Sequence, residues 1–232
     1  IVLLANEHDV VLTPSGGRTG LSAGAVAANG EIVVSMDKMN QIGQFYPADR
    51  IVEVEAGVVT QQLQEFAETK DLYYPVDFAS AGSSQIGGNI GTNAGGIKVI
   101  RYGMTRQWIM GLTVVTGKGD ILQLNRGMVK NATGYDLRQL FIGSEGTLGL
   151  VTHTQIKLER QPQDLNVMVL GMDSFNDVMN VLAAFQAQID LTAFEFFDDV
   201  AIDKLMAHGQ VQEPFESRTK FYTLLEFEAP YE

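Results

Sequence analysis

The stretch "TPSGGRTGLSAG", residues 13–24, follows three apolar residues and carries four glycines in twelve positions. Glycine loses more conformational entropy on folding than any other residue, so a cluster of glycines indicates a structural need. One such need is a tight turn. The other is a ligand that the backbone approaches closely, with N–H groups directed at negative charge. The rest of the sequence has to distinguish between these two interpretations.

Composition limits the classes of protein to consider. The 232 residues, 45% of them hydrophobic, are enough for one large domain or two smaller ones. A net charge of −12 disfavours nucleic acid or an anionic membrane surface as the main partner. The sequence has no cysteine, which excludes disulfides, zinc–thiolate sites and cysteinyl cofactor links. No apolar run reaches the roughly 18 residues of a membrane span, so we expect a cytoplasmic protein without a transmembrane segment.

The hydrophobic pattern predicts an α+β unit over residues 1–158. Thr60 is the predicted N-cap of a helix, and Gly117–Asp120 is the predicted turn of a hairpin. A polar loop is predicted between the second and third strands. The predicted strands cover 10–13, 31–36, 51–57 and 150–158, the hairpin covers 109–124, and the helices cover 1–9, 60–71 and 136–141.

The pattern changes after a polar segment with a proline, residues 159–164, which is the predicted linker. Beyond it the order strand, helix, strand, helix, strand predicts the first part of a second α+β layer over residues 165–232. Ser174 is the predicted N-cap of the first of these helices. The predicted elements cover 165–172, 174–188, 192–198, 199–209 and 219–229.

Several nucleotide and catalytic motifs are absent. The P-loop pattern, the Rossmann glycine spacing, the serine-hydrolase elbow and the H-E-x-x-H helix do not occur. The three histidines lie far apart in the sequence, so we predict no metal site. Glycine-rich segments recur at 16–24, 82–96 and 143–149. Three backbone cradles with interleaved Ser, Thr and Asn favour one long ligand with a diphosphate centre, although each segment alone is equally well explained as a tight turn.

Five motifs in one order carry a family resemblance: "TPSGGRTGLSAGAV" (13–26), "YPVD" (74–77), "GSSQIGGNIGTNAGG" (82–96), "RYG" (101–103) and "VKNATGYDLRQLFIGSEGTLGLVT" (129–152). Together they closely resemble the FAD-linked oxidase family, which has the vanillyl-alcohol-oxidase or PCMH-type flavin fold. The likeness is greatest to the D-2-hydroxyacid dehydrogenases, which include D-lactate dehydrogenase, the glycolate oxidase flavin subunit and D-2-hydroxyglutarate dehydrogenase. It implies a PCMH-type FAD-binding domain over 1–158 and part of an α+β cap domain over 165–232.

The resemblance also implies which residues hold FAD. The first segment would wrap the diphosphate, the second would line the path from the diphosphate to the flavin ring, and the third would embrace adenosine. A histidine bonds the flavin covalently in some relatives, and Arg18 stands at that place, so the FAD is expected to be non-covalent. The implied cofactor-binding residues are Pro14, Ser15, Gly16, Gly17, Arg18, Thr19, Gly20, Leu21, Ser22, Pro75, Asp77, Gly82, Ser83, Gly87, Gly88, Thr92, Asn93, Gly95, Gly96, Tyr102, Gly103, Glu145, Gly146, Gly149, Val151 and Thr152.

Two departures from the family pattern concern the ends of the chain. The family's first βαβ portion and its C-terminal histidine cluster, with its divalent metal, have no counterpart in residues 1–232. We therefore assign no catalytic residue and expect this chain alone to be inactive. Arg101 and Arg106 are candidates for a substrate carboxylate, although a surface position explains them equally well.

The expected function is oxidation of a D-2-hydroxyacid such as D-lactate, glycolate or D-2-hydroxyglutarate to the 2-oxoacid, by hydride transfer to FAD. The electron acceptor is unassigned, a peripheral membrane location through that acceptor stays open, and so does a homodimer. The alternatives are a flavin oxidase or synthase of the same fold with another substrate, a non-catalytic flavin-binding subunit, and a glycine-rich structural protein without a ligand. Reduction of a bound flavin by a hydroxyacid, or a colourless protein that ignores added FAD, would distinguish them.

Overall fold

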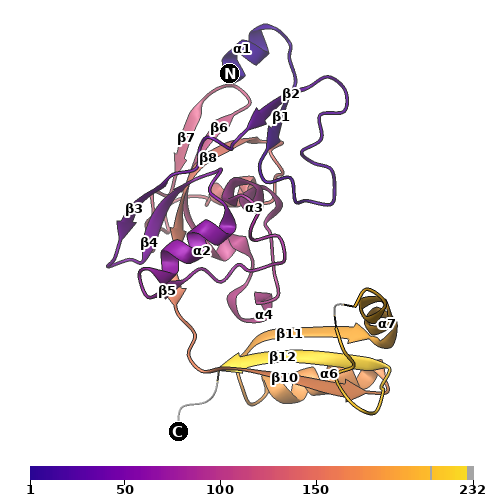
Figure 1. Ribbon diagram of the computed structural model, residues 1–232. Coiled ribbons are helices and arrows are strands. Elements are labelled where there is room, and N and C mark those ends of the chain that lie inside the picture. The colour runs from indigo at the N-terminus through magenta and orange to yellow at the C-terminus, as the bar shows by residue number, and fades with distance from the viewer. Residues whose placement is uncertain (210, 229–232) are drawn as a thin grey trace. The chain divides into compact units, whose positions relative to one another are not determined.

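The computed structural model describes residues 1–209 and 211–228 (Figure 1). The chain divides into two compact units. The first consists of Ile1–Gly96 and Met104–Gln161. The second consists of Ile97–Gly103 and the chain from Pro162 onward. A short piece of the amino-terminal half therefore belongs to the second unit.

The first unit is built on a five-stranded antiparallel sheet with the order β3-β4-β8-β6-β7. Its core is apolar, because Val52, Val54, Val114 and Ile156 are fully or almost fully buried. The burial of these β-branched side chains stabilises the sheet. The strands are β3 (Ile42–Tyr46), β4 (Ile51–Glu55), β6 (Ile109–Thr116), β7 (Ile121–Leu124) and β8 (Gly149–Lys157).

Shorter elements surround this sheet (Figure 1). Strand β1 (Leu12–Ser15) pairs in parallel with β2 (Ile32–Ser35), and β5 (Leu72–Tyr73) pairs antiparallel with β9 (Glu159–Arg160). Helix α3 (Ile86–Thr92) contacts β4 and β8, and α2 (Thr60–Glu68) contacts β5. The remaining elements are α1 (Val2–Glu7), the 3₁₀-helix η1 (Thr105–Trp108) and α5 (Arg138–Phe141).

The second unit is a three-stranded antiparallel sheet of order β10-β12-β11. Aromatic side chains hold it together: Phe175 makes edge contacts with Phe196 and Phe221, and Tyr222 stacks between Phe197 and Phe215. Such pairs add to the free energy of burial. The elements are α4 (Val99–Tyr102), β10 (Leu165–Met172), α6 (Phe175–Gln186), β11 (Leu191–Asp198), α7 (Asp199–Ala207) and β12 (Phe221–Glu228).

Several element predictions are confirmed. The hairpin of β6 and β7 lies at 109–124, and the order of elements after residue 164 is the predicted one. Ser174 caps α6 by accepting a hydrogen bond from the backbone N–H of Asp177. The predicted last strand extends to Ala229, which lies outside the described residues.

Other element predictions are wrong. Strand β3 lies where a loop was predicted, because an exposed edge strand with a bulge lacks the alternation of buried and exposed residues. Thr60 is the first residue of α2 rather than its N-cap, because its hydroxyl is buried against Ser84. Helix α3 lies inside a glycine-rich segment for which no helix was predicted, and β9 lies at the start of the segment predicted as a linker.

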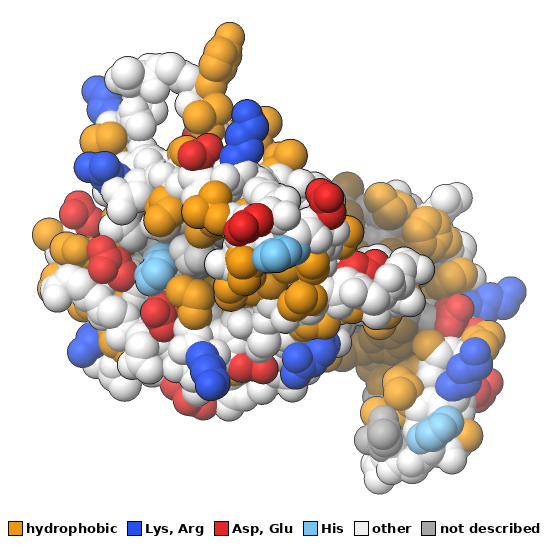
Figure 2. Space-filling model, turned by 90° about the horizontal axis from the view of Figure 1, so that it is seen from above, with side chains coloured by type: hydrophobic (Ala, Val, Ile, Leu, Met, Phe, Trp, Pro, Cys, Tyr) orange, Lys and Arg blue, Asp and Glu red, His pale blue; other side chains and the backbone are white. Residues whose placement is uncertain are grey.

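Charged side chains of both signs are interspersed on one face of the molecule. On the face shown in Figure 2, Lys and Arg are scattered among acidic and apolar side chains. No helix of the described residues has the length and hydrophobicity needed to cross a bilayer.

Candidate functional site

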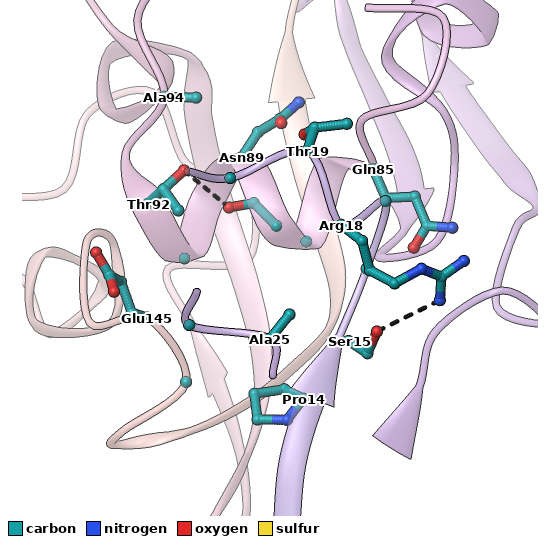
Figure 3. A pocket seen from close by; sticks show the side chains of 18 of the residues that line it. Pro14, Ser15, Arg18, Thr19, Ala25, Gln85, Asn89, Thr92, Ala94 and Glu145 are labelled. Carbon is teal, nitrogen blue, oxygen red and sulfur yellow. Dashed lines mark hydrogen bonds between the residues drawn. The ribbon is translucent and has the colours of Figure 1, made fainter. Parts of the chain in front are cut away.

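All three glycine-rich segments reach one cavity in the first unit, with a volume of about 830 Å³ (Figure 3). We call it the glycine-lined cavity. Its walls are the loop 14–26 after β1, helix α3 with the residues that follow it, and the turn 143–149 that leads into β8. The volume lies in the range of about 300–1,000 Å³ that is typical of small-molecule sites. The convergence favours a common ligand over three unrelated tight turns.

The first segment enters the cavity on β1. The carbonyl oxygen of Ser15 accepts a hydrogen bond from the N–H of Met36, which continues the pairing of β1 with β2 (3.0 Å). Gly17 then packs against the second segment, where a Cβ would lie 2.2 Å from the carbonyl oxygen of Ser83. Only glycine allows the two loops to approach this closely.

The second segment is anchored on β4. In α3 the N–H of Gly87 donates to the carbonyl oxygen of Ala56 (2.7 Å). A Cβ on Gly87 would lie 2.7 Å from the Cβ of Ala56, whereas a Cβ on Gly88 would meet no atom within 4 Å. Gly87 therefore serves the packing of α3 on the sheet, and Gly88 leaves open space in the cavity wall.

A buried polar network fixes the orientation of α3. The amide of Asn89 donates to Thr60 Oγ1 (2.7 Å), and Thr60 Oγ1 also lies 2.7 Å from Ser84 Oγ. All three side chains are at least 95% buried. Because buried polar groups are costly when they lack partners, this network holds the helix against α2.

The third segment is bonded to the end of α3. The N–H of Gly143 donates to Ile90 O (2.9 Å), and the N–H of Glu145 donates to Gly91 O (2.8 Å). Glu145 has a left-handed backbone with φ of 50°. These bonds bring the Glu145 side chain to the cavity (Figure 3).

Two side chains among the described lining residues are charged, Arg18 and Glu145. The Arg18 guanidinium donates to Ser15 Oγ at 3.5 Å (Figure 3). The ion pairs among the described residues do not include Arg18. Asp37 lies nearby. The Gln85 amide donates to its carboxylate (2.8 Å) and lowers the pKa of Asp37, with smaller contributions from Ser35 and Arg18. The cavity thus has a cation available for an anionic ligand.

Most of the residues expected at a FAD site line this cavity. They are Pro14, Ser15, Gly16, Gly17, Arg18, Thr19, Gly20, Leu21, Ser22, Gly87, Gly88, Thr92, Gly95, Glu145, Gly146, Gly149 and Val151.

The other expected residues do not line the cavity and have different places in the structure. Gly96 is tightly packed, since its Cβ would lie 1.7 Å from the carbonyl oxygen of Asp77. Asn93 is the left-handed C-cap of α3, and the hydroxyl of Thr152 donates to a carbonyl of the neighbouring strand β6. Tyr102 and Gly103 belong to the second unit. The residues outside the lining are Pro75, Asp77, Gly82, Ser83, Asn93, Gly96, Tyr102, Gly103 and Thr152.

The two arginine candidates for a substrate carboxylate also have protein partners. Arg101 pairs with Glu228, and Arg106 donates to the carbonyl oxygen of Ile142 (2.9 Å) and to Gln139. Among the described residues, no cluster of His, Cys, Asp or Glu could hold a metal ion.

The sequence interpretation missed several lining residues. Gln85 and Asn89 flank the glycine pair of α3, and their place inside a glycine-rich motif is a signal that could have identified them. Met36, Phe78 and Phe141 supply apolar wall and carry no sequence signal, because their role depends on tertiary packing.

Two family models match the chain. The model described as "FAD binding domain" matches residues 1–125, and the model described as "FAD linked oxidases, C-terminal domain" matches residues 161–232.

Individual relatives agree with these matches. A Stutzerimonas stutzeri protein named D-2-hydroxyglutarate dehydrogenase is 66% identical, covering 100% of this chain and 50% of that protein. A protein of the same name from Xanthomonas citri pv. viticola is 52% identical, covering 99% and 48%. The chain spans about half the length of the curated relatives it matches. A solved structure of alkyldihydroxyacetonephosphate synthase has a TM-score of 0.77 at 22% identity, covering 99% of this chain and 44% of that one, which shows a shared fold.

Proposed function

Since this chain belongs to the family of FAD-binding domains, we propose that the glycine-lined cavity is the place where FAD binds. The observation that carries the proposal is the convergence of three separated glycine-rich segments on one cavity. The same cavity contains Arg18, a side chain suited to phosphate. Three unrelated tight turns would not explain why the segments converge or why a cation lies among them.

The open glycines support the fit of the cofactor. At Gly20 and Gly88 an added Cβ would meet no protein atom within 4 Å, and neither residue has a positive φ. Neither chain packing nor backbone conformation requires glycine there. Glycine at both positions is explained if a bound molecule lies against the backbone.

The two charged lining residues suggest how FAD is oriented. Its diphosphate would lie near Arg18 and the backbone N–H groups of residues 16–20, where positive charge is available. The Glu145 carboxylate repels phosphate and accepts hydrogen bonds from hydroxyl groups, so it would face the ribose of adenosine. No described lining residue is His or Cys, which supports non-covalent binding.

We propose further that the whole enzyme oxidises a D-2-hydroxyacid to the 2-oxoacid, with D-2-hydroxyglutarate as the substrate. The names and identities of the curated relatives support this substrate. When bound, FAD supplies the ring that accepts a hydride. This chain's own residues would hold and orient the cofactor and exclude water from it, through the loop 14–26, α3 and the turn 143–149.

Binding of FAD is tested by titrating the purified chain and following flavin absorbance and fluorescence. We expect Arg18→Gln to raise the dissociation constant roughly 10- to 100-fold, because a hydrogen bond to a charged group contributes about 1.5–3 kcal/mol. The matched control is Arg160→Gln, which removes the same charge at an exposed position outside the cavity. Failure of the wild-type chain to bind FAD, or equal loss in both variants, would refute the site.

The substrate is tested with the full-length enzyme loaded with FAD and mixed anaerobically with one hydroxyacid at a time. D-2-hydroxyglutarate should bleach the oxidised flavin faster than D-lactate or glycolate does. Faster bleaching by another acid would replace the proposed substrate. A bound flavin that no hydroxyacid reduces would favour the non-catalytic subunit.

A further inference from the structure

The segment Ile97–Gly103, which we call the latch segment, belongs to the second unit, although the residues on both sides of it, Gly96 and Met104, belong to the first. Its ends are fixed. Both the N–H and the hydroxyl of Thr105 donate to the carbonyl oxygen of Ala94 (2.9 and 2.8 Å), and Thr105 is fully buried. Gly96 packs so closely on Asp77 that a Cβ would lie 1.7 Å from the Asp77 carbonyl oxygen. Ala94 and Gly95, just before the latch segment, line the glycine-lined cavity.

The latch segment is held in the second unit by charge. Lys98 Nζ lies 3.0 Å from Glu226 Oε1, and these side chains are only 10% and 16% exposed. Arg101 pairs with Glu228, with both side chains 28% exposed. The hydroxyl of Thr192 on β11 also donates to Glu226 (2.8 Å). Both ion pairs are therefore at least partly shielded from solvent, and attraction between partly buried charges is screened less than attraction between fully exposed ones.

The spacing of the four charges fixes the register of this contact. Lys98 and Arg101 are three residues apart and share one face of the helical turn at α4. Glu226 and Glu228 are two residues apart and share one face of β12. A shift by one residue along β12 would present the apolar Phe227 instead of a carboxylate. The latch segment thus has one favourable position on the second unit. If it left that position, four charged side chains would lose their partners.

We propose that the latch segment couples occupancy of the glycine-lined cavity to the second unit. A ligand that orders Ala94 and Gly95 also restricts the latch segment, because the chain continues directly from these residues. Conversely, a latch segment paired with β12 holds Ala94 and Gly95 in the position in which they line the cavity. Such coupling is reciprocal by thermodynamic linkage. The inference rests on the proposed function only for the identity of the ligand, FAD. Lys98 and Arg101 are then positioning residues, since they act through the segment's ends.

The test uses a double variant, Glu226→Gln with Glu228→Gln, and a matched control, Asp203→Asn with Glu213→Gln. The control removes the same two charges in the same unit, from the partners of Arg218, away from the latch segment. The measurements are the FAD dissociation constant and hydrogen exchange of the amides in 97–103. We expect the latch variant to lose protection there and to bind FAD about fivefold more weakly or worse, with the control unchanged on both measures. Adding FAD to the wild type should slow exchange in 97–103.

The outcomes separate the two proposals. Lost protection in the latch variant with unchanged FAD affinity would overturn the coupling. If the wild type binds no FAD, the proposed function fails, and the coupling to FAD fails with it. If the Glu226→Gln, Glu228→Gln double variant does not fold, Arg101→Gln removes only the more exposed ion pair, and FAD affinity and hydrogen exchange are measured on that variant instead. Lys98→Arg should keep wild-type affinity, and a loss there equal to that of Lys98→Met would overturn the role of the ion pair.

Discussion

Replacing Gly87 by alanine should destabilise the first unit, whereas the same change at Gly88 should stabilise it. Both residues lie within α3, so both variants gain the helical preference of alanine over glycine, about 0.8–1 kcal/mol. The difference lies in the space that the new methyl group meets. At Gly88 a Cβ meets no atom within 4 Å, so the gain should appear undiminished.

At Gly87 the new Cβ would lie 2.7 Å from the Cβ of Ala56 and 3.0 Å from its carbonyl oxygen. Carbon atoms prefer a separation of about 3.5–4.0 Å, so α3 or β4 must shift by roughly 1 Å. Overpacking of this kind costs about 1–3 kcal/mol, which exceeds the helical gain. The two variants should therefore differ in free energy of unfolding by about 2 kcal/mol, or about 4–8 °C in midpoint for a chain of this size.

Urea unfolding without FAD measures this difference through the chain's single tryptophan, Trp108. That residue is 7% exposed in η1 of the first unit, so its emission reports unfolding of that unit. Gly117→Ala is the control, since a Cβ there also meets nothing within 4 Å and the residue lies in the β6–β7 turn outside the cavity.

The two positions should rank differently in FAD affinity than they do in stability. Gly88→Ala places a methyl group in the cavity and should weaken FAD binding although the protein is more stable, and Gly88→Leu should weaken it further. Gly87→Ala, once folded, should weaken FAD binding less than Gly88→Leu does, because its methyl group meets Ala56 and acts on the cavity only through the shift of α3. Equal destabilisation by both alanine variants would refute the assignment of Gly88 to the cavity wall, and wild-type affinity in Gly88→Leu would refute contact with the ligand.

Two further predictions concern stability. The hydrogen bond from Arg138 lowers the pKa of Asp136 to about 2, so its contribution is present above the unfolded pKa of about 3.9 and is lost as the pH falls towards 2. Because Asp136 is 42% exposed, we expect Asp136→Asn to cost about 1 kcal/mol or less at pH 7 in urea titrations. The cost should be clearly smaller at pH 2, where about half of the folded-state carboxylate is protonated, and an equal cost at both pH values would contradict the ion pair as its origin. Thr60→Val should cost about 2 kcal/mol in the same assay, since it leaves the buried groups of Asn89 and Ser84 without this partner, and a neutral result would show that the network rearranges.

The sequence patterns predict the parts of the fold that rest on local chemistry. The hairpin turn Gly117–Asp120 and the N-cap at Ser174 need only neighbouring residues, and both are found where they were predicted. Helix α3 was missed because its three glycines disfavour a helix, and tertiary packing on Ala56 outweighs that preference.

The candidate site divides in the same way. The three glycine-rich walls could be predicted, because loops whose backbone lines a cavity are rich in glycine and can be recognised in the sequence. The apolar wall at Met36 and Phe78 could not, because these residues look like any other core residues in the sequence. Likewise, the pairing of Lys98 with Glu226 joins residues 128 positions apart, and single charges in a sequence carry no information about such distant partners.

The left-handed backbone at Glu145 has an evolutionary consequence. A side chain in this conformation costs about 1 kcal/mol or more relative to glycine, and the turn would relax if the residue were Gly or Asn. Retaining glutamate is therefore favoured only while its carboxylate is useful. On the proposed role of Glu145 at the ribose of FAD, descendants that no longer bind the cofactor should drift to Gly or Asn at this position before the rest of the turn changes, and residue 145 would then be an early marker of that loss.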